Sequence, residues 1–204
     1  MKVLIIDYKM GNVGSVKRAL EECGATEVVI SHDLRDFEDC THAVLPGVGA
    51  FPDAMKHLKD HGLINPIKKF ATEDGVPFLG ICLGMQLLAS VGEEIAACDG
   101  LDLIPGNIEI LKSQNNERIP HVGWNEINIK KSDHLFEGIS NQSDFYFVHS
   151  YHFKPTSTEN IICTTPYCGE FISVVRNGNI IGTQFHPEKS AATGFKLLKN
   201  FLNL

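Results

Sequence analysis

The sequence has no cluster of lysine or arginine and no long apolar stretch free of breaks. Its formal net charge is −7, so we expect neither nucleic acid nor an anionic membrane as a partner. A long stretch without a charged residue covers residues 76–92, and it is interrupted by Pro77, Gly80, Gly84 and Gln86. A strand followed by a helix explains this stretch better than a membrane span does.

The six cysteines include no C-x-x-C pair and form no closely spaced framework, which argues against a disulfide-stapled fold. We also expect no export signal, because the first apolar run is short and lies between Lys2 and Asp7. We therefore expect reduced thiols and a cytoplasmic protein. For any single cysteine, the default interpretation is a small buried apolar side chain.

The chain of 204 residues lacks internal repeats, low-complexity segments and a Pro/Gly/Ser-rich linker, so we expect one domain over residues 1–204. Hydrophobic residues make up 43% of the chain and charged residues 21%, which is typical of a globular protein with a sizeable core. The first half alternates strand-like and helix-like segments, which predicts a mainly parallel sheet with helices on both faces. The predicted strands are residues 3–6, 28–30, 43–45 and 78–81, and the predicted helices are residues 13–23, 64–73 and 83–90.

The second half is richer in strands and ends in a helix. Asn177-Gly178 lies between two of these strands and predicts a tight hairpin turn. The whole pattern predicts an α/β fold with an open, mostly parallel mixed sheet, whose ligands lie at the carboxyl ends of the parallel strands. The predicted strands are residues 107–111, 126–129, 145–153, 161–164, 173–175 and 180–185, and the helix starts at about Ala191.

One cysteine stands between two glycines where a strand gives way to a helix, in Gly80-Ile81-Cys82-Leu83-Gly84. This is the G-x-nucleophile-x-G form of a nucleophile elbow, in which small residues permit a sharp turn and the apex side chain projects. The start of the next helix favours a thiolate there. On this pattern alone, a buried structural cysteine is an equally good interpretation.

A second segment, Gln184-Phe185-His186-Pro187-Glu188, is extended because Pro187 disfavours helix at His186. Residues two apart in an extended segment point to the same side, so Glu188 can orient the His186 imidazole. That supplies the base and the orienting acid of a Cys-His-acid triad. Taken alone, a surface histidine beside a solvated glutamate is the more common case. A zinc deaminase site would need a later P-C-x-x-C, which is missing, so we expect no metal.

The third segment, Pro46-Gly47-Val48-Gly49, follows a predicted strand. Its glycines would let backbone N–H groups turn toward a ligand, which suits half of an oxyanion hole, with the amide of Leu83 as the other half. An ordinary βα turn is the alternative. A nucleotide-binding loop fits poorly, because Pro52 stands where the third glycine of G-x-G-x-x-G would be.

These three segments, together with their surroundings, resemble the class I glutamine amidotransferase family over essentially the whole chain. The motifs that carry the resemblance are GICLGMQLL, PGVGAF and QFHPEKS. Within the family, the segments IPHVGWN (119–125), FYFVHSY (145–151) and LIPG (103–106) resemble the glutaminase subunits of imidazole glycerol phosphate synthases. The resemblance implies the flavodoxin-like architecture of that family.

The resemblance also implies an activity and a partner. Glutamine would be hydrolysed to glutamate and ammonia through a cysteine thioester, without a cofactor. Ammonia would pass through a protected channel to a (β/α)₈-barrel cyclase subunit in a heterodimer. That subunit would make imidazole glycerol phosphate and aminoimidazole-carboxamide ribonucleotide, in histidine biosynthesis.

Carried over to this sequence, the family roles make Cys82 the nucleophile, His186 the base and acid, and Glu188 its orienting partner. The amides of Val48 and Leu83 would form the oxyanion hole. The residues that would hold glutamine are Gly47, Gly49, Gln86, His149, Ser150 and Tyr151. The residues that match positions facing the cyclase are Asn12, Trp124, Tyr146 and Lys189, although their composition alone favours core aromatics and a solvated lysine.

One departure from the family pattern concerns the first loop, which usually has glycine where this chain has Lys9. A long cation there leaves open a paralogue that feeds ammonia to an enzyme aminating surface sugars. A cysteine peptidase of similar architecture is a further alternative. A non-enzymatic α/β sensor or chaperone-like protein is an alternative of another class, but it would need neither Glu188 nor Gln86.

Overall fold

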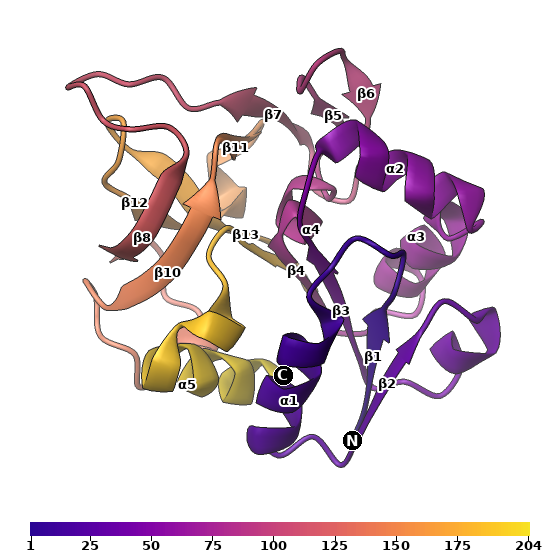
Figure 1. Cartoon of the computed structure of the whole chain (residues 1–204). Coiled ribbons are helices and arrows are strands. Elements are labelled where there is room, and N and C mark those ends of the chain that lie inside the picture. Colours follow the sequence, from indigo (N-terminus) through magenta and orange to yellow (C-terminus); the bar gives the residue numbers. More distant parts are fainter.

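The computed structural model describes the whole chain, residues Met1–Leu204. Figure 1 shows a central sheet with helices packed on both of its faces. None of the helices has the length and apolar character that crossing a bilayer requires. The helices are α1 (Val13–Glu22), α2 (Phe51–Asp60), α3 (Ile64–Thr72), α4 (Leu83–Gln86) and α5 (Ala191–Phe201), with 3₁₀ turns η1 (Leu34–Phe37), η2 (His134–Phe136), η3 (Thr158–Asn160) and η4 (Pro187–Lys189).

The main sheet has 12 strands in the order β2-β1-β3-β4-β14-β13-β11-β7-β5-β6, with β12 and β9 attached through β13. A second sheet contains only β8 (His121–Glu126) and β10 (Asp144–His149). The strands of the main sheet are β1 (Lys2–Ile6), β2 (Glu27–Ser31), β3 (His42–Gly47), β4 (Phe78–Cys82), β5 (Val91–Gly92), β6 (Cys98–Asp99), β7 (Gly106–Ile110), β9 (Asn128–Ile129), β11 (Tyr151–Pro155), β12 (Ile161–Thr165), β13 (Phe171–Asn177) and β14 (Ile180–Thr183).

The predicted open mixed sheet is confirmed. Parallel pairing joins β2, β1, β3, β4 and β14, whereas β13, β11 and β7 pair antiparallel. The change follows the hairpin between β13 and β14, where Asn177 pairs with Ile180 across a two-residue turn. The predicted turn at this place is therefore also confirmed. The parallel half brings the carboxyl ends of β1, β3, β4 and β14 to one edge.

Two apolar cores cover the faces of the parallel half. Val3 and Ile5 of β1 belong to the core under α1 and α5, and Leu4 and Ile6 belong to the core under α2 and α3. This alternation follows from the period of two along a strand. Because both faces are buried, the strands are continuous apolar runs rather than alternating ones.

Some predicted boundaries were wrong. The helix expected over residues 83–90 ends at Gln86, because residues 87–89 form tight turns and the chain then enters β5. A helix this short has only a small macrodipole, so it does little to favour a thiolate at Cys82, contrary to the expectation from the sequence. The strand expected over residues 145–153 is two strands in different sheets, separated at Ser150. Helix α2 and most of β8 were not predicted, and the strand expected over residues 126–129 is the end of β8 followed by β9.

Candidate active site

Cys82 is the last residue of β4 and directly precedes α4. Its backbone has φ 55° and ψ −111°, a left-handed conformation that costs a non-glycine residue about 1–3 kcal/mol. Both flanking positions must be glycine, because a side chain at either one would collide with the backbone. A Cβ atom on Gly80 would lie 2.6 Å from the carbonyl oxygen of Gly84, and one on Gly84 would collide with the carbonyl oxygen of Leu45. The predicted sharp turn at this cysteine is therefore present.

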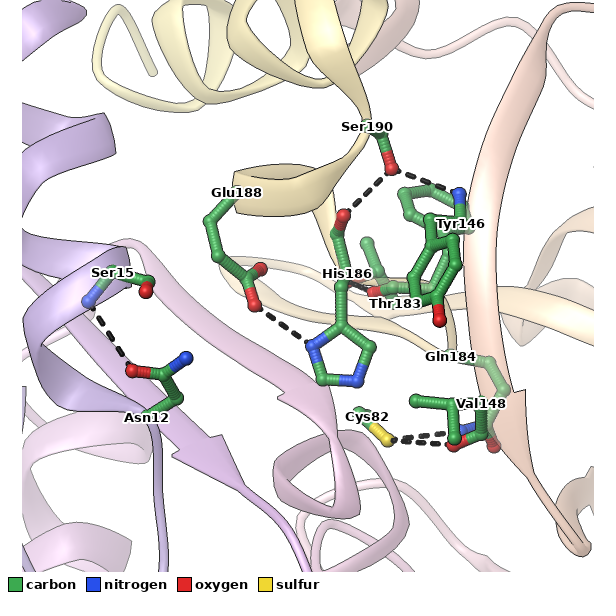
Figure 2. A network of polar contacts seen from close by, with 11 residues as sticks. Asn12, Ser15, Cys82, Tyr146, Val148, Thr183, Gln184, His186, Glu188 and Ser190 are labelled. Carbon is green, nitrogen blue, oxygen red and sulfur yellow. Dashed lines mark hydrogen bonds and ion pairs between the residues drawn. The ribbon is translucent and has the colours of Figure 1, made fainter. Parts of the chain in front are cut away.

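His186 lies between Glu188 and Cys82, as Figure 2 shows. Its Nδ1 is 2.8 Å from Oε1 of Glu188, and the two side chains are only 3% and 1% exposed. Its Nε2, on the side of Cys82, has no hydrogen-bond partner. Burial by itself lowers the pKa of His186, but the Cys82 and Glu188 side chains outweigh burial and raise the pKa to about 9. The ring therefore favours the imidazolium form at neutral pH, and it lies beside the Cys82 sulfur.

Backbone and hydroxyl contacts hold His186 in place. Its N–H donates to the carbonyl of Tyr146 at 2.9 Å, and its carbonyl accepts from Ser190 Oγ at 2.6 Å. The same Ser190 oxygen accepts from the N–H of Tyr146 at 3.0 Å. Strand β10, which carries Tyr146, therefore fixes the position of the histidine (Figure 2).

Two buried glutamine side chains, Gln86 and Gln184, link Cys82 to the backbone carbonyl of Tyr151. Nε2 of Gln86 donates to the carbonyl of Tyr151 and to Oε1 of Gln184, both at 3.0 Å. Nε2 of Gln184 lies 3.7 Å from the Cys82 sulfur and donates to it. Gln86, expected to hold substrate, thus has only its Oε1 free. Gln184 was not singled out from the sequence as a site residue, although it belongs to the same motif as His186.

A pocket of about 260 Å³ opens beside the cysteine. It includes Glu94, which no sequence motif marks. Oε2 of Glu94 accepts from the N–H of Phe51 at 2.7 Å, so the carboxylate also caps the start of α2. Gly47 does not line the pocket. The lining residues are Val48, Gly49, Cys82, Leu83, Gln86, Glu94, Val148, His149, Ser150, Tyr151 and His186.

His149 is committed to the protein rather than free for a ligand. Its Nδ1 donates to the carbonyl of Tyr151 at 2.8 Å, and its Nε2 accepts from Nδ1 of His121 at 3.0 Å. Nε2 of His121 in turn accepts from Asn125 at 3.3 Å. Burial lowers the pKa of His121 to about 4 and that of His149 to about 3, so both rings are neutral. The pair fixes the bend at Ser150, where the chain passes from β10 to β11.

The amide expected in the oxyanion hole is not turned toward the pocket. The N–H of Val48 donates to the carbonyl of Met10 at 2.9 Å. Met10 follows Lys9, whose φ of 71° is unusual for a residue with a side chain. The Lys9 side chain folds back on Asp7 with an Nζ–Oδ2 distance of 2.8 Å, so this cation is paired within its own loop.

The residues expected to face a partner lie near the mouth of the site. Tyr146 pairs with Trp124, and Val148 pairs with Val122, across β10 and β8. Directly opposed residues share a face of the sheet, and here that face is exposed, with Trp124 at 54% and Val122 at 56%. We call these four residues the aromatic-valine patch. Val148 belongs both to this patch and to the pocket.

Asn12 and Lys189 are also exposed. Asn12 Oδ1 accepts from the N–H of Ser15 at 3.4 Å and so caps α1. Lys189 lies in η4, directly after Glu188. No group of three or more His, Cys, Asp and Glu side chains is arranged to hold a metal ion.

Comparison with known sequences places the chain among amidotransferases. The model of the family "Glutamine amidotransferase class-I" matches residues 4–204. The chain is 46% identical to the imidazole glycerol phosphate synthase subunit HisH of Moorella thermoacetica, over 98% of this chain and 93% of that protein. It is 44% identical to the imidazole glycerol phosphate synthase subunit HisH 1 of Campylobacter jejuni subsp. jejuni serotype O:23/36, over 99% of this chain and 100% of that protein.

Solved structures agree on the fold. The crystal structure of a glutamine amidotransferase superposes with a TM-score of 0.74 at 18% identity, covering 98% of this chain and 97% of that one. PurLQS from Thermotoga maritima superposes with a TM-score of 0.74 at 21% identity, covering 99% of this chain and 97% of that one. With its nucleophile elbow, its buried His-Glu pair and a family match across residues 4–204, this chain belongs to the class I glutamine amidotransferase family.

Proposed function

We propose that the chain is the glutaminase subunit of an imidazole glycerol phosphate synthase, with Cys82, His186 and Glu188 as its catalytic residues. The observation that carries the chemistry is the position of the His186 ring between the buried Glu188 and the strained Cys82. The observation that favours this synthase over other amidotransferases is the 42–46% identity to HisH subunits over nearly the full chain.

The reaction starts from the thiolate–imidazolium pair. The Cys82 sulfur attacks the side-chain amide carbon of glutamine, and the carbonyl oxygen becomes an oxyanion. His186 gives its proton to the departing nitrogen, the carbon–nitrogen bond breaks, and ammonia and a glutamyl thioester result. His186, now neutral, takes a proton from water, which attacks the thioester and releases glutamate. Glu188 keeps the ring oriented throughout and stabilises its charged form.

The pocket suits the rest of a glutamine molecule. Glu94 offers the only carboxylate in the lining, and a carboxylate pairs with the α-ammonium group of an amino acid. Ser150 and the free Oε1 of Gln86 supply neutral polar contacts. His149 serves as a positioning residue, because both of its nitrogens are already bonded.

The resting conformation is one of low activity in this proposal. With the Val48 N–H bonded to Met10, only the Leu83 amide remains of the expected oxyanion hole. A missing oxyanion donor typically lowers kcat by about 10²–10³. A partner docked on the aromatic-valine patch would press on β10, which holds His186 and carries Val148 into the pocket. We therefore propose that a (β/α)₈ cyclase subunit binds there, receives the ammonia and stimulates glutamine hydrolysis.

The test measures glutamate release from glutamine by the free chain and with a (β/α)₈ cyclase added. We expect a slow free chain, strong stimulation by the cyclase and no activity in Cys82→Ser. Glu188→Gln keeps the shape of the carboxyl group but removes its charge, so we expect kcat to fall by about 10²–10⁴. Wild-type rates in both variants would refute the triad. Stimulation by a sugar amidotransferase but not by the cyclase would refute the role in histidine synthesis.

A further inference from the structure

One buried hydroxyl beside the active site has no partner. Tyr8 follows strand β1 and is only 1% exposed, and its Oη makes no hydrogen bond. Buried polar groups are nearly always bonded, because an unpaired one loses its hydration without compensation. A hydroxyl left unpaired in one conformation therefore points to a partner in another.

The hydroxyl lies against Gly47, the residue before Val48. A Cβ atom on Gly47 would collide with the Tyr8 oxygen and would lie 2.9 Å from the amide nitrogen of Gly84. The hydroxyl thus lies close to the Gly47 backbone, on the side from which a Cβ atom would project. Burial, with the charge of Cys82 added to it, raises the pKa of Tyr8, so the hydroxyl stays a proton donor.

The peptide between Gly47 and Val48 carries both groups that matter here. Its N–H now points to the carbonyl of Met10. A peptide group is planar and turns as one unit, so turning this N–H toward an oxyanion swings the Gly47 carbonyl to the side of Met10. Two carbonyl oxygens would then face each other, and the Gly47 carbonyl would need a new donor. Gly47 lacks a side chain, so its backbone can make such a turn.

We infer that the Tyr8 hydroxyl donates to the Gly47 carbonyl once this peptide has turned, which makes Tyr8 a positioning residue for the oxyanion-binding amide of Val48. The inference rests on the proposed glutaminase function. The side chain touches no substrate and acts only on the balance between the two backbone conformations. The hydroxyl therefore stabilises the turned conformation and adds nothing to the resting one.

Tyr8→Phe tests this inference because it removes one oxygen atom and keeps the ring. Loss of a neutral hydrogen bond in the turned conformation should lower the kcat of the free chain about fivefold, with KM for glutamine unchanged. The stimulated kcat should fall by this factor or less, because the partner already favours the turned conformation. The melting temperature should not fall. Alkylation of Cys82 by iodoacetamide, which creates no oxyanion, should proceed at the wild-type rate.

The matched control is Tyr167→Phe. Its hydroxyl donates to the Arg118 carbonyl at 2.7 Å in the resting structure, so its removal should lower stability and leave kcat unchanged. An unchanged kcat of the free chain in Tyr8→Phe, or a lowered melting temperature like that of the control, would overturn the inference while the proposed function stands. A wild-type chain that does not hydrolyse glutamine with any partner would overturn both.

Discussion

The backbone N–H of Val48 donates to the backbone carbonyl of Met10 at 2.9 Å, across the loops that follow β3 and β1. This bond commits the amide to Met10, although Cys82, His186 and Glu188, the proposed catalytic residues, are already assembled. The proposed catalytic side chains and the proposed oxyanion donor are thus held by separate sets of contacts. A bond of this kind contributes about 1 kcal/mol net, so a partner can break it with a small part of its binding energy.

Gly47→Ala should lower both stability and activity. The added Cβ would collide with the Tyr8 hydroxyl and lie 2.9 Å from backbone and side-chain atoms of α4, and such overpacking costs about 1–3 kcal/mol. Urea unfolding and glutamine hydrolysis would measure the two effects. Gly14→Ala is the matched control, because nothing lies within 4 Å of its added Cβ and α1 should gain about 1 kcal/mol. Equal behaviour of the two variants would contradict the crowding at Gly47.

The sequence predicts the parts of the site that depend on local geometry. Glycines on both sides of Cys82 and the proline between His186 and Glu188 restrict the backbone enough to place these side chains. Glu94 reaches the site only through tertiary packing, and no motif marks it. His121 lies in the IPHVGWN segment, but its bond to His149 arises only when β8 pairs with β10. The bond from the Val48 N–H to Met10 depends on which of two backbone conformations the loop adopts. Residue types alone do not determine that conformation.

The strand predictions failed for a related reason. Side chains with a ring recur at every second residue from Phe145 to Phe153, so the pattern suggests one strand. The chain nevertheless changes sheets at Ser150, because the Tyr151 carbonyl accepts hydrogen bonds from His149 and from Gln86 instead of continuing the ladder with β8. Such hydrogen bonds from side chains to the backbone cannot be predicted from the spacing of hydrophobic residues.

Glu94→Gln should raise KM for glutamine about tenfold, with a smaller effect on kcat. The amide oxygen can still accept from the N–H of Phe51, but the charge that would pair with the α-ammonium group is lost. Steady-state kinetics with the partner present would measure this. Glu93→Gln, an equal charge change at the exposed neighbour, should leave KM unaltered. The same shift in both variants would show that general electrostatics, rather than a contact by Glu94, is responsible.

Trp124→Ala should weaken binding of the cyclase by about 30-fold or more, because a tryptophan at an interface centre is typically worth about 2 kcal/mol. The side chain is 54% exposed in the free chain, so the free energy of unfolding should change by only about 0.5 kcal/mol. Calorimetric titration would measure the affinity. Leu34→Ala, at a leucine 51% exposed outside the aromatic-valine patch, should bind like the wild type. Undiminished affinity in Trp124→Ala would place the interface elsewhere.

Stability should fall as the pH drops from 6.5 toward 4. Burial lowers the pKa of His121 to about 4 and that of His149 to about 3, whereas an unfolded histidine has a pKa of 6.5. In this window the unfolded chain binds more protons than the folded chain, so each ring lowers the free energy of unfolding by up to about 1.4 kcal/mol per pH unit. His42 and His152, whose pKa values burial also lowers, act with the same sign. Urea unfolding at closely spaced pH values would measure the slope, and NMR would assign it, since the ring signals of His121 and His149 should not titrate between pH 5 and 8. Titration of either ring in that range would contradict the neutral His121–His149 pair.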